Sequence, residues 1–230
     1  MQGLPENLAR EPGANRFFKE STMKIVVVFP TLTEAQFFSH PQVAIEICGV
    51  GLAATAYNTG KIIQRQQPDW LIMAGIAGVY PGSAYAVGDT VLVAAECEAD
   101  LGFFTPRGFT HLADLELAMD FTVQRQWLCP HLPQDLPLPL ARSNSVNAAM
   151  APFIKTRGVD IENMEGAAFF QVCLSEQQRF LQVRAISNEV VIGDEDWDFS
   201  GSIRNLAQGL HKVIAGLQGK GGEVNPASFI

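Results

Sequence analysis

Long apolar runs are missing from this sequence of 230 residues. The longest apolar stretch, Trp70 to Val79, contains two glycines and falls well short of the ~20 apolar residues that a membrane helix needs. The N-terminus carries charges from Glu6 onward and has no apolar segment typical of a signal peptide. We therefore expect a cytoplasmic protein with no membrane partner.

Positive charge and paired cysteines are also scarce. The chain has 16 Lys and Arg residues against 24 Asp and Glu residues, a net charge of -8, and no basic cluster. Because proteins that bind a nucleic-acid backbone usually carry a basic stripe, we expect no nucleic-acid partner. No CxxC pair or metal-ligand spacing involves the four cysteines, so we expect reduced, mostly buried thiols and no metal. They are Cys48, Cys97, Cys129 and Cys173.

Hydrophobic residues make up 47% of the chain, which is enough for one buried core. Residues 1–22 contain prolines, glycines and scattered charges without any period, so we expect a flexible extension and a fold that begins at Met23. One domain is expected over residues 23–218, followed by a C-terminal tail over 219–230.

Short apolar runs alternate with helical patterns along this domain. The predicted strands are 25–29, 43–48, 70–74, 90–95, 159–162 and 181–186, and the predicted helices are 52–66, 147–156, 166–176 and 202–217. The stretch 100–141 is rich in loops. This alternation predicts an α/β fold with a largely parallel sheet.

Functional residues of such sheets lie at the ends of strands and in the loops that follow. Glu34 follows the first strand, where a carboxylate can act as a general base; alternatively, it is an ordinary glutamate at a helix N-terminus. The small residues of Gly75–Gly78 either let a ligand approach the backbone or serve tight packing between a strand and a helix.

Two further strand ends carry polar residues. Glu165 lies between an apolar strand and a helix start rich in small residues, where a buried carboxylate needs a partner. Two adjacent ribose hydroxyls fit, because a carboxylate can accept from both; the alternative is again a helix N-terminal glutamate. Asn188 can recognise the edge of a base, or it can be a turn or N-cap residue.

In order along the chain, these segments resemble the nucleoside phosphorylase and nucleosidase superfamily. The matching features are a Met-Lys-Ile strand with a glutamate eleven residues after the Met, Gly-x-Ala-Gly, Gly-Asp, Met-Glu-x-x-Ala and Arg-Ala-Ile-Ser-Asn, over roughly residues 23–217. The chain is similar to the hydrolase branch of methylthioadenosine/S-adenosylhomocysteine nucleosidases, whose pattern ends Ile-Ser-Asp, and it resembles the futalosine hydrolases most. The resemblance implies one three-layer α/β/α domain with a central mixed, largely parallel twisted sheet.

The resemblance also implies roles for individual residues. Glu34 matches the glutamate that activates water, Glu165 the one that binds the ribose hydroxyls, Met164 the residue packed against the ribose, and Asn188 the acid that handles N7 of the purine. The other expected substrate-binding residues are Ala77, Gly78, Asn163, Arg184, Ser187 and Phe199. No cofactor is implied.

Phosphorylases of the superfamily bind phosphate with an Arg and a Ser or Thr beside the glycine loop. Met73 and Ile76 occupy those places here, which favours water as the nucleophile. The resemblance further implies a homo-oligomer, a dimer or higher. We expect the aromatic residues of 100–109 near a subunit interface or the 5′ side of the substrate; the alternative is a plain core cluster.

Asn188 also bears on the choice of base. Hypoxanthine presents the acceptor O6 beside N7, and a carboxylate facing O6 would leave buried acceptors unpaired at about 1–3 kcal/mol each. An amide can donate to O6 and accept from protonated N7. Asn188 therefore suits a 6-oxopurine, and the resemblance implies that the substrate is futalosine, hydrolysed to hypoxanthine in menaquinone biosynthesis. The alternatives are an adenine nucleosidase for methylthioadenosine, S-adenosylhomocysteine or aminodeoxyfutalosine, a phosphorylase, and a catalytically silent nucleoside-binding protein.

Overall fold

The computed structural model describes residues 23–115, 122–135, 137–193 and 196–219. The strands are β1 (Ile25–Phe29), β2 (Val43–Ile47), β3 (Trp70–Val79), β4 (Thr90–Glu98), β5 (Gly102–Thr105), β6 (Gly108–His111), β7 (Trp127–Leu128), β8 (Leu140–Ser145), β9 (Ile161–Asn163) and β10 (Phe180–Glu189). The helices are α1 (Leu32–Ala35), α2 (Leu52–Gln66), α3 (Gly166–Ser175) and α4 (Phe199–Gly219), with a 3-10 turn at Leu112–Asp114. The predicted N-terminal extension lies outside the described residues, and α4 continues to Gly219, the first residue of the predicted tail.

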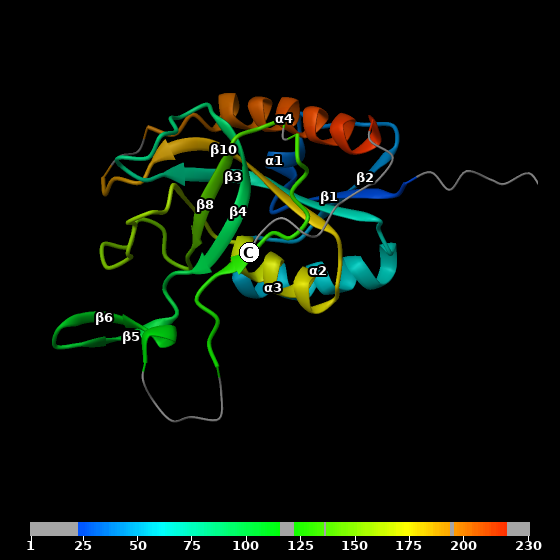
Figure 1. The fold of residues 1–230 in the computed structure, drawn as a ribbon. Helices are drawn as coiled ribbons and strands as arrows, with labels where there is room; N and C mark the ends of the chain where they lie inside the picture. The colour runs from blue at the N-terminus through cyan, green and yellow to red at the C-terminus, as the bar shows by residue number, and fades with distance from the viewer. Residues whose placement is uncertain (1–22, 116–121, 136, 194–195, 220–230) are drawn as a thin grey trace, which may run out of the picture.

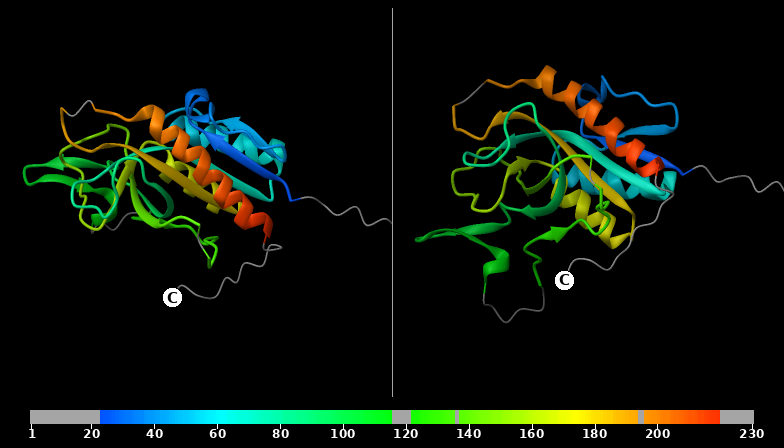
Figure 2. Two further views of the ribbon diagram at one scale, coloured as in Figure 1. Left: turned by 90° about the horizontal axis from the view of Figure 1, so that it is seen from above. Right: turned by 45° about the horizontal axis from the view of Figure 1, so that its top comes forward.

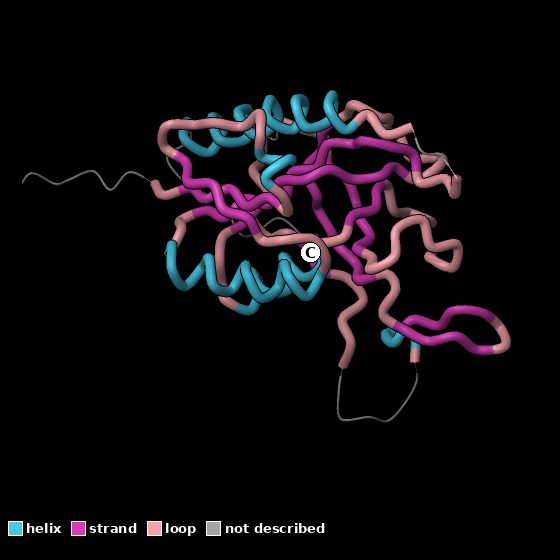
Figure 3. Tube along the Cα trace, turned by 180° about the vertical axis from the view of Figure 1, so that it is seen from behind, coloured by secondary structure: helices cyan, strands magenta, loops and turns pink. Residues whose placement is uncertain are grey.

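Helices cover both faces of one twisted sheet, as Figures 1 and 2 show. Helix α4 lies on one face together with the short α1, whereas α2 and α3 lie on the other; the view from behind shows the same layers (Figure 3). The pairs β1–β2, β1–β3, β3–β10, β4–β8 and β8–β9 are parallel, and β4–β10, β3–β9 and β4–β7 are antiparallel. The predicted three-layer fold with a mixed, largely parallel sheet is confirmed.

The sheet is also closed on itself, which the sequence did not indicate. The first half of β3 pairs with β1, and its second half pairs with β9 on that same side. Strand β10 then joins β3 to β4, so the pairings β3–β10–β4–β8–β9–β3 form a ring. All five strands in the ring are therefore paired on both sides, which fixes the register of the residues near their ends.

Most predicted elements are confirmed, and their lengths follow from tertiary pairing. Strand β3 runs past Gly75 to Val79 rather than stopping at residue 74, because its second half pairs with β9 and β10. Helix α4 begins at Phe199 rather than at Ser202, because the carboxylate of Asp198 accepts the backbone N–H of Gly201 and so caps an earlier start.

The predicted helix over 147–156 is wrong. This described stretch consists of turns, and Met150 has a φ of 58°, in the left-handed region. Pro152 explains part of the difference, because proline inside a helix lacks the N–H donor and clashes with the preceding turn. The strand predicted at 159–162 is displaced to β9 at Ile161–Asn163.

The aromatic segment 102–111 forms the β5–β6 hairpin, which projects from the body in Figure 1. Phe103 and Phe104 are exposed, and the Phe104 ring packs on Phe153 at 5.0 Å between centroids. The alternative of a plain core cluster is therefore wrong, and the expected position near a subunit interface or the 5′ side of the substrate stays a prediction. No helix within the described ranges is long and apolar enough to cross a membrane.

The four cysteines are unpaired, and three of them are buried; Cys97 is half-buried. Helix α4 has one apolar side, because Ile203, Leu206, Leu210 and Val213 are all buried.

Gly166, the first residue of α3, allows the helix to lie close to the sheet. A Cβ there would overlap the carboxylate of Glu96 and lie 2.7 Å from Nε2 of Gln182. We expect Gly166→Ala to lower the free energy of unfolding by about 1–3 kcal/mol. As a matched control, Gly60→Ala inside α2 meets no atom within 4 Å and should raise it by about 0.5–1 kcal/mol. Urea unfolding of both variants measures this, and equal effects would contradict the packing argument.

Candidate active site

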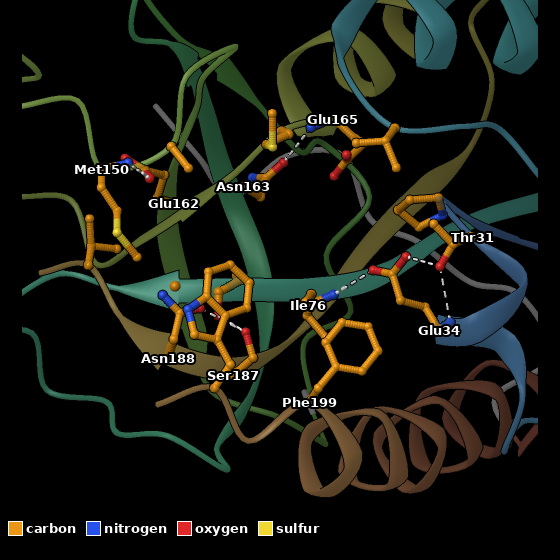
Figure 4. Close-up of a pocket in the computed structure, with 18 residues that line it drawn as sticks. Thr31, Glu34, Ile76, Met150, Glu162, Asn163, Glu165, Ser187, Asn188 and Phe199 are labelled. Atoms are coloured by element: carbon orange, nitrogen blue, oxygen red, sulfur yellow. Dashed lines mark hydrogen bonds between the residues drawn. The ribbon is translucent and has the colours of Figure 1, made fainter. Parts of the chain in front are cut away.

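Four strand ends meet at one pocket, drawn in Figure 4. They are the ends of β1, β3, β9 and β10, as expected for ligand sites in sheets of this kind. The residues that line the pocket are Pro30, Thr31, Glu34, Val50, Ile76, Ala77, Gly78, Ala149, Met150, Glu162, Asn163, Met164, Glu165, Ser187, Asn188, Val190, Trp197 and Phe199. The structure therefore brings together nine of the ten residues selected from the sequence; Arg184 lies behind the pocket wall.

Glu34 lies in the first turn of α1, yet its side chain is only 6% exposed and faces the pocket. Thr31 holds it from both ends: the Thr31 hydroxyl donates to Oε2 of Glu34 at 2.7 Å and accepts the backbone N–H of Glu34 at 3.2 Å. The backbone N–H of Ile76 donates to Oε1 at 3.1 Å. Glu34 is thus a glutamate in the first turn of a helix, and its side chain also points into the pocket.

Burial raises the pKa of the Glu34 carboxyl, and the hydrogen bonds from Thr31 and Ile76 oppose that rise only in part. A carboxylate whose pKa is raised toward neutrality is better suited to take a proton from water than an ordinary surface glutamate.

Arg184 is completely buried and connects the strands under the pocket. Its Nη1 donates to Oε2 of Glu165 at 3.1 Å and to the backbone oxygen of Ile76, also at 3.1 Å. Gly75 makes room for this guanidinium, because a Cβ there would lie 2.5 Å from Nη1. The small residues of Gly75–Gly78 thus serve two purposes. Gly75 lets Arg184 approach the backbone, and Ala77 and Gly78 line the pocket.

Glu165 is the N-cap residue of α3 and is 4% exposed. Its Oε2 is paired with Arg184, and its Oε1 accepts the backbone N–H of Gly51 at 3.2 Å. A carboxylate offers about four acceptor positions, so two remain for a ligand in the pocket. This capacity suits two neighbouring hydroxyl groups.

The side-chain amide of Asn163 is used within the protein. Its Oδ1 accepts the backbone N–H groups of Glu165 and Gly166 at 2.8 and 2.7 Å and Nη2 of Arg184 at 3.0 Å. Its Nδ2 donates to Glu96 and Ser143. Asn163 therefore caps α3 and orients Glu165, although part of its surface also lines the pocket.

Glu96 is a buried carboxylate that the sequence analysis missed. It accepts from Ser145, Asn163 and Gln182, and it is completely buried. Burial raises its pKa, and the positive charge of Arg184 opposes that rise. In the sequence it sits inside an ordinary strand pattern, so nothing marks it. Only the fold brings its donors Ser145, Asn163 and Gln182, and the charge of Arg184 on the neighbouring strand β10, close to it.

Asn188 and Ser187 end β10 at a bulge in its pairing with β3. Ser187 Oγ lies 2.9 Å from Oδ1 of Asn188, and Nδ2 of Asn188 donates to the backbone oxygen of Glu189 at 3.0 Å. This leaves one N–H of the amide, and one acceptor position on its oxygen, for a ligand.

Nine of the lining residues were not selected from the sequence, among them Glu162, Met150 and Trp197. Glu162 accepts from the Tyr80 hydroxyl and the Met150 backbone, and Trp197, which also lines the pocket, is 46% exposed. Met150 and Trp197 belong to irregular segments without a hydrophobic period, so only their placement in space identifies them.

The ionisable side chains among the described lining residues are all acidic. The pocket lining contains three carboxylates, Glu34, Glu162 and Glu165, and no Lys or Arg among the described residues. Over the same described part of the chain, no group of three or more His, Cys, Asp or Glu side chains is arranged to hold a metal ion. The arrangement favours a neutral, hydroxyl-bearing ligand over an anion.

Known proteins are similar to this chain in sequence and in fold. Residues 140–217 match the model of the Phosphorylase superfamily. A futalosine hydrolase of Thermus thermophilus is 30% identical over 181 residues, which cover 73% of this chain and 79% of that protein. A methylthioadenosine/S-adenosylhomocysteine nucleosidase of S. pneumoniae superposes with a TM-score of 0.66 at 20% identity, over 85% of this chain and 100% of that one. A futalosine hydrolase of Helicobacter pylori gives 0.64 at 15%, over 85% and 98%.

The raised pKa of Glu34 predicts a pH-dependent stability. The protonated Glu34 carboxyl contributes stability at a pH below the pKa that this carboxyl has in the unfolded chain. That stability is lost as the pH rises through the higher pKa that the carboxyl has in the folded protein. Glu34→Gln removes this loss, so its gain in melting temperature over the wild type should be larger at about pH 8 than at about pH 4. Glu176→Gln, at an exposed glutamate, is the control and should show no such difference. A gain that is equal at both pH values would contradict the assignment.

Proposed function

The chain belongs to the nucleosidase family of the futalosine hydrolases, within the phosphorylase superfamily, and from that premise we propose that it hydrolyses futalosine. The reaction breaks the N-glycosidic bond and releases hypoxanthine and dehypoxanthine futalosine, a step of menaquinone biosynthesis. As a member of this family it is a purine nucleoside N-glycosidase; the futalosine substrate, the cytoplasmic location and a homo-oligomeric state are the finer parts of the proposal.

The observation that carries the proposal is the acidic pocket lined by Glu34 and Glu165 without a basic side chain. Phosphate would have to enter beside three carboxylates with no cation among the described lining residues to pair with it. Water has no such cost, and the buried Glu34 is available to deprotonate it. The pocket therefore favours hydrolysis over phosphorolysis.

In the proposed reaction the glycosidic bond weakens first, and positive charge develops on the ribose. Glu165, oriented by Arg184 and Gly51, accepts hydrogen bonds from the 2′ and 3′ hydroxyls and offers negative charge near the developing cation. Glu34 takes a proton from the water that attacks C1′. Met164 packs against the sugar in this arrangement.

Asn188 recognises and stabilises the leaving base in the proposal. Its free N–H donates to O6 of hypoxanthine, and its oxygen accepts from N7–H once N7 is protonated. An amide cannot supply an acidic proton, so the proton on N7 comes from solvent, and Asn188 stabilises the protonated base. Ser187 orients the amide through the contact to Oδ1.

Release of free base from a panel of nucleosides tests this function. We expect hypoxanthine from futalosine at the same rate with and without phosphate, and a rate at least about tenfold lower for aminodeoxyfutalosine and methylthioadenosine. Glu34→Gln should lower kcat about 100- to 10,000-fold because the general base is lost, with the wild-type fold retained by circular dichroism.

Each alternative predicts a different result in this assay. A requirement for phosphate indicates a phosphorylase, faster adenine release indicates an adenine nucleosidase, and tight binding without turnover indicates a silent binding protein. Any of these outcomes contradicts the proposed function.

Asn188→Asp changes the donor at O6 into an acceptor. We expect the ratio of kcat/KM for futalosine to that for aminodeoxyfutalosine to fall by about 10- to 100-fold, because O6 loses its donor while N6 gains an acceptor. Steady-state kinetics measure the ratio with the two nucleosides, which differ in the oxo or amino group at position 6 and in the N1 hydrogen that accompanies the oxo group. An unchanged ratio would remove Asn188 from base recognition.

A further inference from the structure

A second carboxylate, Glu162, lines the pocket away from the one proposed to activate water. In Figure 4 it lies on the same side of the pocket as Asn188, and Glu34 and Thr31 lie on the other side. None of the roles proposed above uses it. It is 5% exposed, so its charge is kept from solvent and needs a function or a complete set of partners.

Strand register fixes where Glu162 stands. Glu162 on β9 and Asn188 on β10 are both register partners of Gly78 on β3. Because adjacent strands lie about 4.8 Å apart, the Cα atoms of Glu162 and Asn188 are roughly 9–10 Å apart across the glycine. The two side chains therefore flank a strip of backbone that carries no side chain.

Gly78 keeps this strip flat. A Cβ at this position would lie 2.7 Å from Cγ2 of Val190 and 3.1 Å from Nδ2 of Asn188, on the face where Asn188 projects. Directly opposed residues of antiparallel strands project to the same face, so Glu162 projects there too. A planar ligand can lie over Gly78 with one polar side chain at each end of its edge.

The partners of Glu162 leave part of its carboxylate unused. Oε2 accepts from the Tyr80 hydroxyl at 2.7 Å, and Oε1 accepts from the backbone N–H of Met150 at 2.8 Å. Tyr80 also accepts from Nδ2 of Asn144. About two of the four acceptor positions remain for a ligand. Burial and the Glu162 charge raise the pKa of Tyr80, so its hydroxyl stays a donor to the carboxylate.

We propose that Glu162 is a second base-recognition residue, which accepts a hydrogen bond from N1–H of a 6-oxopurine. Along the edge of such a base, O6 lies between N7 and N1–H. Asn188 serves N7 and O6, and Glu162 serves N1–H. Adenine has no hydrogen on N1, so its N1 lone pair would face the carboxylate and be repelled. The inference rests on the proposed release of a 6-oxopurine and identifies what rejects the 6-amino base besides Asn188.

Binding of free bases tests this role without requiring turnover. Isothermal titration should give the wild type a preference for hypoxanthine over adenine and over 1-methylhypoxanthine, in which a methyl group replaces the N1 hydrogen. Glu162→Gln should weaken hypoxanthine binding about 10- to 100-fold, because a hydrogen bond to a charged group is lost. Adenine binding should be unchanged or stronger, because the new amide can donate to its N1.

Two controls separate recognition from structural support. Glu176→Gln makes the same change of charge at an exposed position remote from the pocket and should leave both affinities unaltered. Tyr80→Phe removes one donor to Glu162 but keeps the carboxylate, so the preference for hypoxanthine over adenine should persist. If Glu162 only holds the Met150 turn, Glu162→Gln will weaken both bases equally, which overturns the proposal.

The wild type alone also decides the question should Glu162→Gln fail to fold. Equal affinity for hypoxanthine and 1-methylhypoxanthine overturns the proposal. The test is independent of the 5′ part of the substrate: if futalosine is not cleaved but hypoxanthine binding depends on Glu162, the proposed substrate fails while the base-recognition role stands.

Discussion

The buried guanidinium of Arg184 is the interaction on which the rest of the site depends. Arg184 itself lies on β10. Its guanidinium contacts Ile76 and Met73 of β3, Asn163 of β9 and Glu165 at the start of α3. A charge without solvent is stable only with partners, and removing one member of such a set commonly costs several kcal/mol. The position of Glu165 in the pocket is therefore coupled to the packing of three strands and a helix.

Arg184 is a single buried cation that interacts with three buried glutamates, so acids outnumber bases in this network. Glu165 is paired with Arg184 directly, whereas Glu34 and Glu96 are influenced by it only at longer range, and burial raises the pKa of both. The same network thus fixes the Glu165 carboxylate in the pocket and leaves Glu34 with an increased proton affinity. For Glu34 and Glu96, burial is the largest cause of the raised pKa, and the charge of Arg184 opposes it.

The sequence was sufficient for the α/β fold and for the strand ends that form the pocket, because buried strands leave continuous apolar runs and the motifs follow them directly. It was not sufficient for Glu96 and Glu162, which sit in β4 and beside Asn163 in β9 with no local sign of their partners. Met150 was assigned to a helix because propensity outweighed Pro152. Glu96 and Glu162 acquire their positions from strand register, a property of pairs of distant segments rather than of any one of them.

The ring of strands has a consequence for the order in which the molecule is assembled. Strand β10 fills the place between β3 and β4, and Ser187 contacts Ala77 across 110 residues of chain. Loop closure over such a separation is slow compared with local structure formation. During synthesis from the N-terminus, β1 to β4 must wait for the last quarter of the chain before the ring can close. A truncated or stalled product that lacks β10 therefore exposes two unpaired strand edges, the surface that chaperones and proteases recognise.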